Sequence, residues 1–158
     1  MEEVAIAFRV NGAARTARVE PRLLLSDFIR HRLGLTGTRV GCEMGACGAC
    51  TVILDGEPVR ACLLLAVQLD GGELETVESL GAPEALGPLQ EAFRERHAVQ
   101  CGFCTAGILM TFTALARRGE LPATEAEARV ALAGNLCRCT GYQNIVDAIL
   151  TFAERPGA

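Results

Sequence analysis

Apolar and polar positions alternate along the first ten residues of the chain. Every second position from Val4 to Val10 is apolar, which is the period of a strand with one buried face. Asn11-Gly12 comes next, and this pair is a strong signal for a two-residue hairpin turn. The pattern therefore predicts a strand, a tight turn and a return strand over residues 16–20.

The pattern then becomes helical and returns to short strands. Apolar residues recur at helical spacing over 23–33, and Gly34 stands where a helix C-cap is expected. A glycine-rich stretch over 36–50 predicts a loop. Three more strands are expected, two of them flanking Asp55-Gly56, at residues 51–54, 58–61 and 74–77. These elements would form a small mixed sheet with one main helix.

The second half of the chain follows a helical pattern. A linker rich in glycine and proline is expected over 78–88. Four helices are expected after it, over residues 89–97, 106–117, 124–133 and 143–153. Thr124 and Glu127 have the spacing of a capping box. Short connections favour antiparallel neighbours, so we expect a four-helix bundle. The chain would be an α+β protein with two domains, residues 1–79 and 80–158.

The composition argues against several classes of protein. With 158 residues, 50% of them hydrophobic, the chain is long enough to bury a core. Its net charge of −4 argues against nucleic-acid binding, which normally requires a basic stripe. We see no signal-peptide pattern, and no apolar run reaches the roughly 20 residues that span a bilayer. We therefore expect a cytoplasmic protein without a membrane span, in which paired cysteines act as ligands.

Eight cysteines form two sets of four, with the spacings C-x4-C-x2-C-x11-C and C-x2-C-x32-C-x-C. Thiolates in fours hold thiophilic centres, chiefly zinc or iron–sulfur clusters. The expected metal ligands are Cys42, Cys47, Cys50 and Cys62 in the first set and Cys101, Cys104, Cys137 and Cys139 in the second. Two such centres in one short chain suggest that it passes electrons from one to the other.

The first set has the spacing of plant-type ferredoxins, which bind a [2Fe–2S] cluster. Three thiolates from one loop must converge on a compact core, and Gly41, Gly45 and Gly48 allow the tight backbone that this requires. Zinc is the competing interpretation, but zinc sites usually combine two C-x2-C-like pairs. A Rieske centre needs two histidine ligands, and His31 and His97 lie outside the motifs, where we expect packing or surface roles.

The second set is less diagnostic. Its spacing suits zinc as well as a cluster, and Cys101 with Cys104 alone could form a redox dithiol. Cys101 and Cys104 precede a predicted helix, and Cys137 and Cys139 lie between two others. Helix N-termini stabilise thiolates through the helix dipole. These residues alone leave cluster and zinc open.

Three longer motifs surround the cysteines: GTRVGCEMGACGACT over 37–51, QCGFCT over 100–105 and GNLCRCTGY over 134–142. In this order they resemble the small iron–sulfur subunit of the molybdenum hydroxylases. That family includes xanthine dehydrogenase, carbon monoxide dehydrogenase and aldehyde oxidoreductase. The resemblance covers nearly the whole chain, from Ile6 to about Ile149.

The resemblance implies a β-grasp, ferredoxin-like N-terminal domain and a four-helix C-terminal domain, with one [2Fe–2S] cluster each. It also implies a large partner subunit holding molybdopterin, in its dinucleotide form, and a medium partner subunit holding FAD. The assembly would be a heterotrimer or a dimer of heterotrimers. Electrons would pass from molybdenum to the helical-domain cluster, then to the other cluster, then to FAD or another acceptor. Gln100 and Cys139 match positions beside the pterin in similar proteins.

The chain would itself contribute no catalytic acid, base or nucleophile. Ala106 departs from the family, which commonly has proline there, but alanine is an excellent helix former and the helix should start normally. Arg138 stands between two cysteines, where a positive charge could tune the reduction potential, contact a partner or be solvated. The alternative functions are a free-standing two-cluster electron carrier and a zinc protein or redox sensor.

Overall fold

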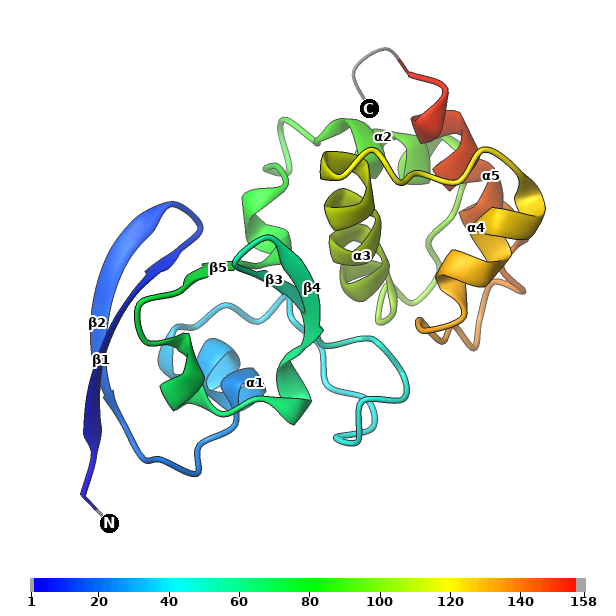
Figure 1. The fold of residues 1–158 in the computed structure, drawn as a ribbon. Helices are drawn as coiled ribbons and strands as arrows, with labels where there is room; N and C mark the ends of the chain where they lie inside the picture. The colour runs from blue at the N-terminus through cyan, green and yellow to red at the C-terminus, as the bar shows by residue number, and fades with distance from the viewer. Residues whose placement is uncertain (1, 156–158) are drawn as a thin grey trace.

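The computed structural model describes residues 2–155 and confirms the α+β class. A five-stranded mixed sheet with a short helix forms one half of the molecule, and four helices form the other (Figure 1). The strands are β1 (Val4–Val10), β2 (Ala13–Val19), β3 (Thr51–Leu54), β4 (Glu57–Arg60) and β5 (Glu73–Glu75). The helices are α1 (Leu25–Asp27), α2 (Pro88–Glu95), α3 (Thr105–Arg117), α4 (Glu125–Leu132) and α5 (Gln143–Ala153).

Both predicted hairpin turns are confirmed. Asn11 and Gly12 have φ of 48° and 79°, and Asp55 and Gly56 have φ of 50° and 84°, as a turn with two left-handed central residues requires. The return strand β2 begins at Ala13, three residues earlier than predicted. A two-residue turn lets pairing start at once, so the neighbours of the turn already pair with each other.

The strand order is β2-β1-β5-β3-β4, with β5 parallel to β1 and antiparallel to β3. The prediction of a strand over 74–77 is only partly right, because β5 ends at Glu75 and Val77–Ser79 forms a 3₁₀ turn. Asn11 explains where the strand stops. Its side chain accepts a hydrogen bond from the Thr76 N–H at 2.9 Å and donates one to the Thr76 hydroxyl at 3.0 Å.

The helix predicted over 23–33 is one α-helical turn, α1, that continues as a π-helical turn over Phe28–Arg32. Gly34 follows with φ of 74°, as predicted for a residue that closes a helix. The buried face of this segment packs under the sheet, where the rings of Phe28 and Phe8 meet edge to face at 5.6 Å. This packing forms the first of two main hydrophobic cores.

Helices α2 to α5 enclose the second core, which includes Phe93, Phe112 and Ile149. The predicted range 143–153 is that of α5. The predicted capping box at α4 is also present. The Thr124 hydroxyl accepts from the Glu127 N–H at 3.3 Å, and the Glu127 carboxylate accepts from the Thr124 N–H at 3.1 Å.

The sheet and the helices contact each other along α3 and β3. Ile53, Met110 and Ala114 form a small third apolar cluster there. At the same boundary an Arg117 Nη2–Glu75 Oε2 contact of 2.8 Å joins α3 to β5. The two halves are therefore packed together rather than tethered by a linker alone.

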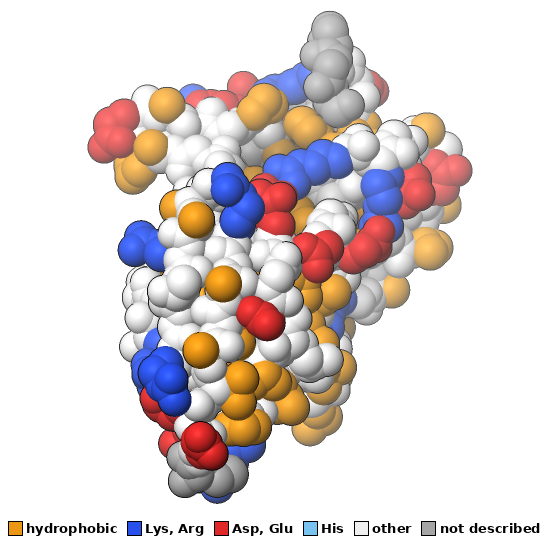
Figure 2. All heavy atoms as spheres, turned by 60° about the vertical axis from the view of Figure 1, so that its left-hand side comes forward, with side chains coloured by type: hydrophobic (Ala, Val, Ile, Leu, Met, Phe, Trp, Pro, Cys, Tyr) orange, Lys and Arg blue, Asp and Glu red, His pale blue; other side chains and the backbone are white. Residues whose placement is uncertain are grey.

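The surface shows mixed charge. Acidic and basic side chains are interspersed on the face seen in Figure 2, and no continuous basic stripe runs across it. Within residues 2–155, none of the helices has the length and apolar character needed to cross a bilayer.

Candidate metal centres

The first three cysteines of the first set lie on the predicted loop between α1 and β3. Glu43, Gly45 and Gly48 all have positive φ, so the loop turns sharply several times within a few residues. Cys62 reaches the same site from the 3₁₀ turn Ala61–Leu63 after β4. The sequence prediction of a fourth member arriving after the Asp55-Gly56 hairpin is thus confirmed.

The thiols of the first set associate in two pairs. Cys42 interacts with Cys47, whose N–H also points to the Cys42 sulfur at 3.3 Å, and Cys50 interacts with Cys62. Backbone N–H groups of Met44 and Cys47 lower the pKa of Cys42 to about 7. Burial raises the pKa of Cys50 to about 11. The set therefore has an outer, half-buried pair and an inner, buried pair.

The second set lies at the ends of helices, as predicted. Cys104 is the N-cap of α3, and Cys137 and Cys139 lie in the connection from α4 to α5. Again there are two pairs. The exposed sulfurs of Cys101 and Cys139 are 3.5 Å apart, and Cys104 interacts with Cys137. α3 begins at Thr105, so Ala106 does not disturb the helix start.

Local contacts separate the thiol pKa values of the second set. Burial, followed by the neighbouring Cys137, raises the pKa of Cys104 to about 12. The N–H of Phe103, followed by Cys139, lowers the pKa of Cys101. Burial opposes ionisation of Cys137, but the Thr140 hydroxyl, 3.1 Å from its sulfur, and nearby N–H groups lower its pKa overall.

The donor set fits a two-iron cluster. Each site offers four thiols, which is the full ligand set of a [2Fe–2S] core. Within residues 2–155, no three Cys, His, Asp or Glu side chains gather closely enough for a single ion. A two-iron core instead takes its thiolates two to each iron, which is the pairing that both sites show. His31 and His97 are exposed, so of the packing and surface roles expected for them the structure shows the surface role.

Gln100 is exposed beside Cys101, on the open side of the second site. Arg138 is exposed between its two cysteines.

The two sites are joined by a narrow seam of hydrogen bonds that the sequence did not predict. The Cys47 carbonyl accepts from the Leu136 N–H at 2.8 Å. The buried Asn135 amide donates to the Gly48 carbonyl at 3.2 Å and accepts from the Thr111 hydroxyl at 3.2 Å. Asn135 and Leu136 belong to the third sequence motif, but nothing in that motif indicates that they contact the first cysteine loop.

Tyr142 contacts the backbone of the second site. Its hydroxyl accepts the Cys137 N–H at 2.8 Å, and its backbone has φ of 70°, in the left-handed region. A tyrosine held in this conformation needs compensating contacts. The hydrogen bond to Cys137 is one, and it orients the backbone of that cysteine.

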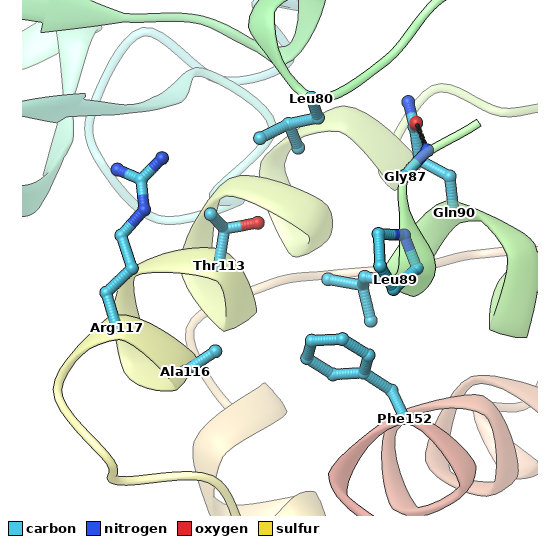
Figure 3. Close-up of a pocket in the computed structure, with 9 residues that line it drawn as sticks. Leu80, Gly87, Leu89, Gln90, Thr113, Ala116, Arg117 and Phe152 are labelled. Carbon is cyan, nitrogen blue, oxygen red and sulfur yellow. Dashed lines mark hydrogen bonds between the residues drawn. The ribbon is translucent and has the colours of Figure 1, made fainter. Parts of the chain in front are cut away.

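A cavity of about 300 Å³ lies away from both cysteine sets, between α2, α3 and α5 (Figure 3). Leu89, Ala116 and Phe152 line its apolar floor, with Thr113 and Arg117 at one side. No cysteine lines it. Arg117 is occupied by its ion pair with Glu75.

Two family models match the two halves of the chain. The 2Fe-2S iron-sulfur cluster binding domain matches residues 8–79, and the [2Fe-2S] binding domain matches residues 76–150. Together they cover most of the chain, and each spans one of the two cysteine sets.

The chain is also similar to several known proteins over almost its full length. It is 53% identical to the caffeine dehydrogenase subunit gamma of a Pseudomonas species, over 94% of this chain and 90% of that protein. It is 44% identical to the xanthine dehydrogenase iron-sulfur-binding subunit of Escherichia coli, over 94% of each chain. Among solved structures, quinoline 2-oxidoreductase from Pseudomonas putida matches with a TM-score of 0.91 and 49% identity, over 98% of this chain and 96% of the other.

The solved relative shares the fold of this chain, and the two family models assign this chain two [2Fe–2S]-binding domains. The expectation drawn from the three cysteine motifs is thereby confirmed: the chain belongs to the family of small iron–sulfur subunits of the molybdenum hydroxylases.

Proposed function

We propose that this chain is the electron-transfer subunit of a multi-subunit molybdenum hydroxylase. It would relay electrons from a molybdenum–pterin centre on a partner, through two [2Fe–2S] sites, to FAD or another acceptor. The observation that carries the proposal is the seam. Two complete four-thiol sets lie on either side of one backbone hydrogen bond, between Cys47 and Leu136.

The eight cysteines would be the ligands, and each thiol pair would hold one iron. The pairs are Cys42 with Cys47, Cys50 with Cys62, Cys101 with Cys139, and Cys104 with Cys137. A bound [2Fe–2S] core supplies reversible one-electron chemistry. The chain's own residues hold the sulfurs, donate N–H groups to them and exclude water from the inner pairs.

The exposed side of the second site would face the molybdenum subunit. Cys101 and Cys139 are both exposed there, and Gln100 is adjacent to Cys101. Gln100 and Cys139 would lie against the molybdopterin, in dinucleotide form, held by the large subunit. Electrons would leave by the first site towards a medium FAD subunit. The complex would be a cytoplasmic heterotrimer or a dimer of heterotrimers.

We also propose that the chain divides into a β-grasp, ferredoxin-like domain over 1–79 and a four-helix bundle over 80–158. Two observations support this division. The sheet and α1 enclose one hydrophobic core, and α2 to α5 enclose another. The glycine- and proline-containing connection between them lies before α2.

Metal analysis and electron paramagnetic resonance (EPR) on the chain purified with its partners would test the proposal. We expect about four irons per chain and, after dithionite reduction, two distinct S = ½ signals. Zinc in place of iron, or two irons with one signal, would contradict the two-cluster function. Purification without a molybdenum-containing chain would instead indicate a free-standing carrier.

A further inference from the structure

A closed ring of hydrogen bonds crosses the seam, and Arg60 donates two of them. The Arg60 guanidinium donates through Nη1 to the Thr51 hydroxyl and through Nη2 to the Gly134 carbonyl, the second at 2.7 Å. The Thr51 hydroxyl donates to the Gly48 carbonyl at 2.6 Å. Asn135, the next residue after Gly134, donates to the same Gly48 carbonyl and closes the ring.

The ring connects the two cysteine sets through short stretches of chain. Thr51 directly follows Cys50, and Gly134 is three residues before Cys137. Arg60 itself ends β4, two residues before Cys62. A planar guanidinium binds two acceptors in a fixed geometry, which a flexible ammonium does not reproduce. Arg60 therefore fixes the first cysteine loop relative to the segment that leads to the second.

Arg60 also brings an unpaired positive charge to the seam. Ten ion pairs form among residues 2–155, and Arg60 belongs to none of them. Its two acceptors are a hydroxyl and a carbonyl, and the side chain is half-buried. A cation in a partly desolvated position acts on nearby charges more strongly than one in water.

We propose that Arg60 is a positioning residue for electron transfer between the two sites, and that its charge favours the reduced state of both. The proposal rests on the proposed function, because it requires both sites to hold clusters. With thiolate ligands, each oxidised cluster is already negatively charged, and reduction adds one more negative charge. A nearby cation lowers the free energy of that added charge, so its removal should make both sites harder to reduce.

Three substitutions separate the geometric role from the electrostatic one. Arg60→Gln removes the charge, Arg60→Lys keeps the charge but loses the planar fork, and Gly134→Ala keeps the arginine. A Cβ on Gly134 would lie 2.7 Å from Arg60 Nη2, so this variant should displace the guanidinium from the carbonyl. The control is Arg15→Gln on β2, because Arg15 is exposed, forms no ion pair among the described residues, and lies on the edge strand.

The experiment is an EPR-monitored redox titration of the intact complex, with magnetic coupling between the two reduced clusters as a measure of their geometry. Arg60→Gln should reduce the electron affinity of both clusters on the order of tenfold, equivalent to about 59 mV for a one-electron couple. Arg60→Lys should keep the potentials near those of the wild type but change the coupling. Gly134→Ala should change the coupling in the same direction as Arg60→Lys, and Arg15→Gln should change neither.

Unchanged potentials and unchanged coupling in Arg60→Gln, with both clusters present, would overturn the inference. So would an equal shift in Arg15→Gln, because the effect would then be one of net charge alone. A wild-type complex that lacks one or both clusters would instead contradict the proposed function. Iron analysis before each titration distinguishes these two kinds of failure.

Discussion

The backbone N–H of Leu136 donates a 2.8 Å hydrogen bond to the carbonyl oxygen of Cys47. Cys47 belongs to the first cysteine set, and Leu136 is bonded directly to Cys137 of the second. One hydrogen bond therefore ties the backbones of the two sites together. A displacement of either loop must lengthen this bond, so the contacts beside it set the separation between the sites.

Gly48→Ala should lower the free energy of unfolding by more than the cost of placing alanine at positive φ. A Cβ on Gly48 would overlap the Gly134 carbonyl oxygen, which is backbone and moves only if the seam opens. Overpacking of this kind costs about 1–3 kcal/mol, in addition to about 1–2 kcal/mol for placing alanine at positive φ. Urea unfolding of the iron-loaded chain would measure the loss.

Gly12→Ala is the matched control for this prediction. Gly12 has φ of 79° against 76° for Gly48, and a Cβ there would meet no atom within 4 Å. It should show only the conformational cost. Equal losses in the two variants would mean that the seam adapts to the extra atom.

Asn135→Asp should destabilise the chain in a pH-dependent way. Asn135 is 1% exposed, and its amide donates to the Gly48 carbonyl. An ionised aspartate cannot donate, so it would bury a charge against that carbonyl at a cost of about 2–4 kcal/mol. The folded state would raise the pKa of this carboxyl, so the loss should be small below pH of about 4 and grow as the pH rises above it.

Asn144→Asp provides the comparison, because the Asn144 amide also donates to a carbonyl, that of His97, but on the surface. Unfolding measured from pH 4 to pH 8 should show little change in that variant. A pH-independent loss in Asn135→Asp would show that the site is open to water.

Single cysteine substitutions should separate the two sites. Cys50→Ala should remove the EPR signal of one cluster and about half the iron, and Cys104→Ala should remove the other signal. The partner in each pair supplies an internal check. Cys62→Ala must lose the same signal as Cys50→Ala, and Cys137→Ala the same signal as Cys104→Ala. Loss of both signals in any one variant would mean that the sites do not assemble independently.

Local sequence patterns were sufficient to predict most elements and both cysteine sets. Alternation and the Asn11-Gly12 pair predicted the first hairpin, because a two-residue turn depends only on its neighbours. Periodicity predicted α5 to the residue. The cysteines of each predicted set lie together because three of the first four are on one loop and the second four are at helix ends, while their role as ligands stays a prediction.

Contacts between the two halves were beyond prediction from local patterns. Asn135 and Gly48 are 87 residues apart, and their hydrogen bond joins the segment after α4 to the first cysteine loop. Arg60 reads in the sequence as an ordinary arginine at the end of a strand. The early end of β5 also depends on a residue distant in sequence, since Asn11, just after the neighbouring strand β1, accepts a hydrogen bond from the Thr76 N–H.

Removal of iron should leave cysteines of very different reactivity. The pKa of Cys42 is lowered to about 7, so about half of this thiol is ionised at pH 7, whereas those of Cys50 and Cys104 are raised to about 11 and about 12. Because the thiolate is the nucleophile, Cys42 in the iron-free chain should react with iodoacetamide at pH 7 at least about a hundredfold faster than Cys50 or Cys104. Labelling of Cys50 and Cys104 should rise only as the pH approaches their raised pKa values.

Peptide mass spectrometry would measure the labelling rates. The control is the same chain in urea, where all thiols should react alike. Equal labelling without urea would mean that the loop loses its N–H contacts to Cys42 when iron is removed.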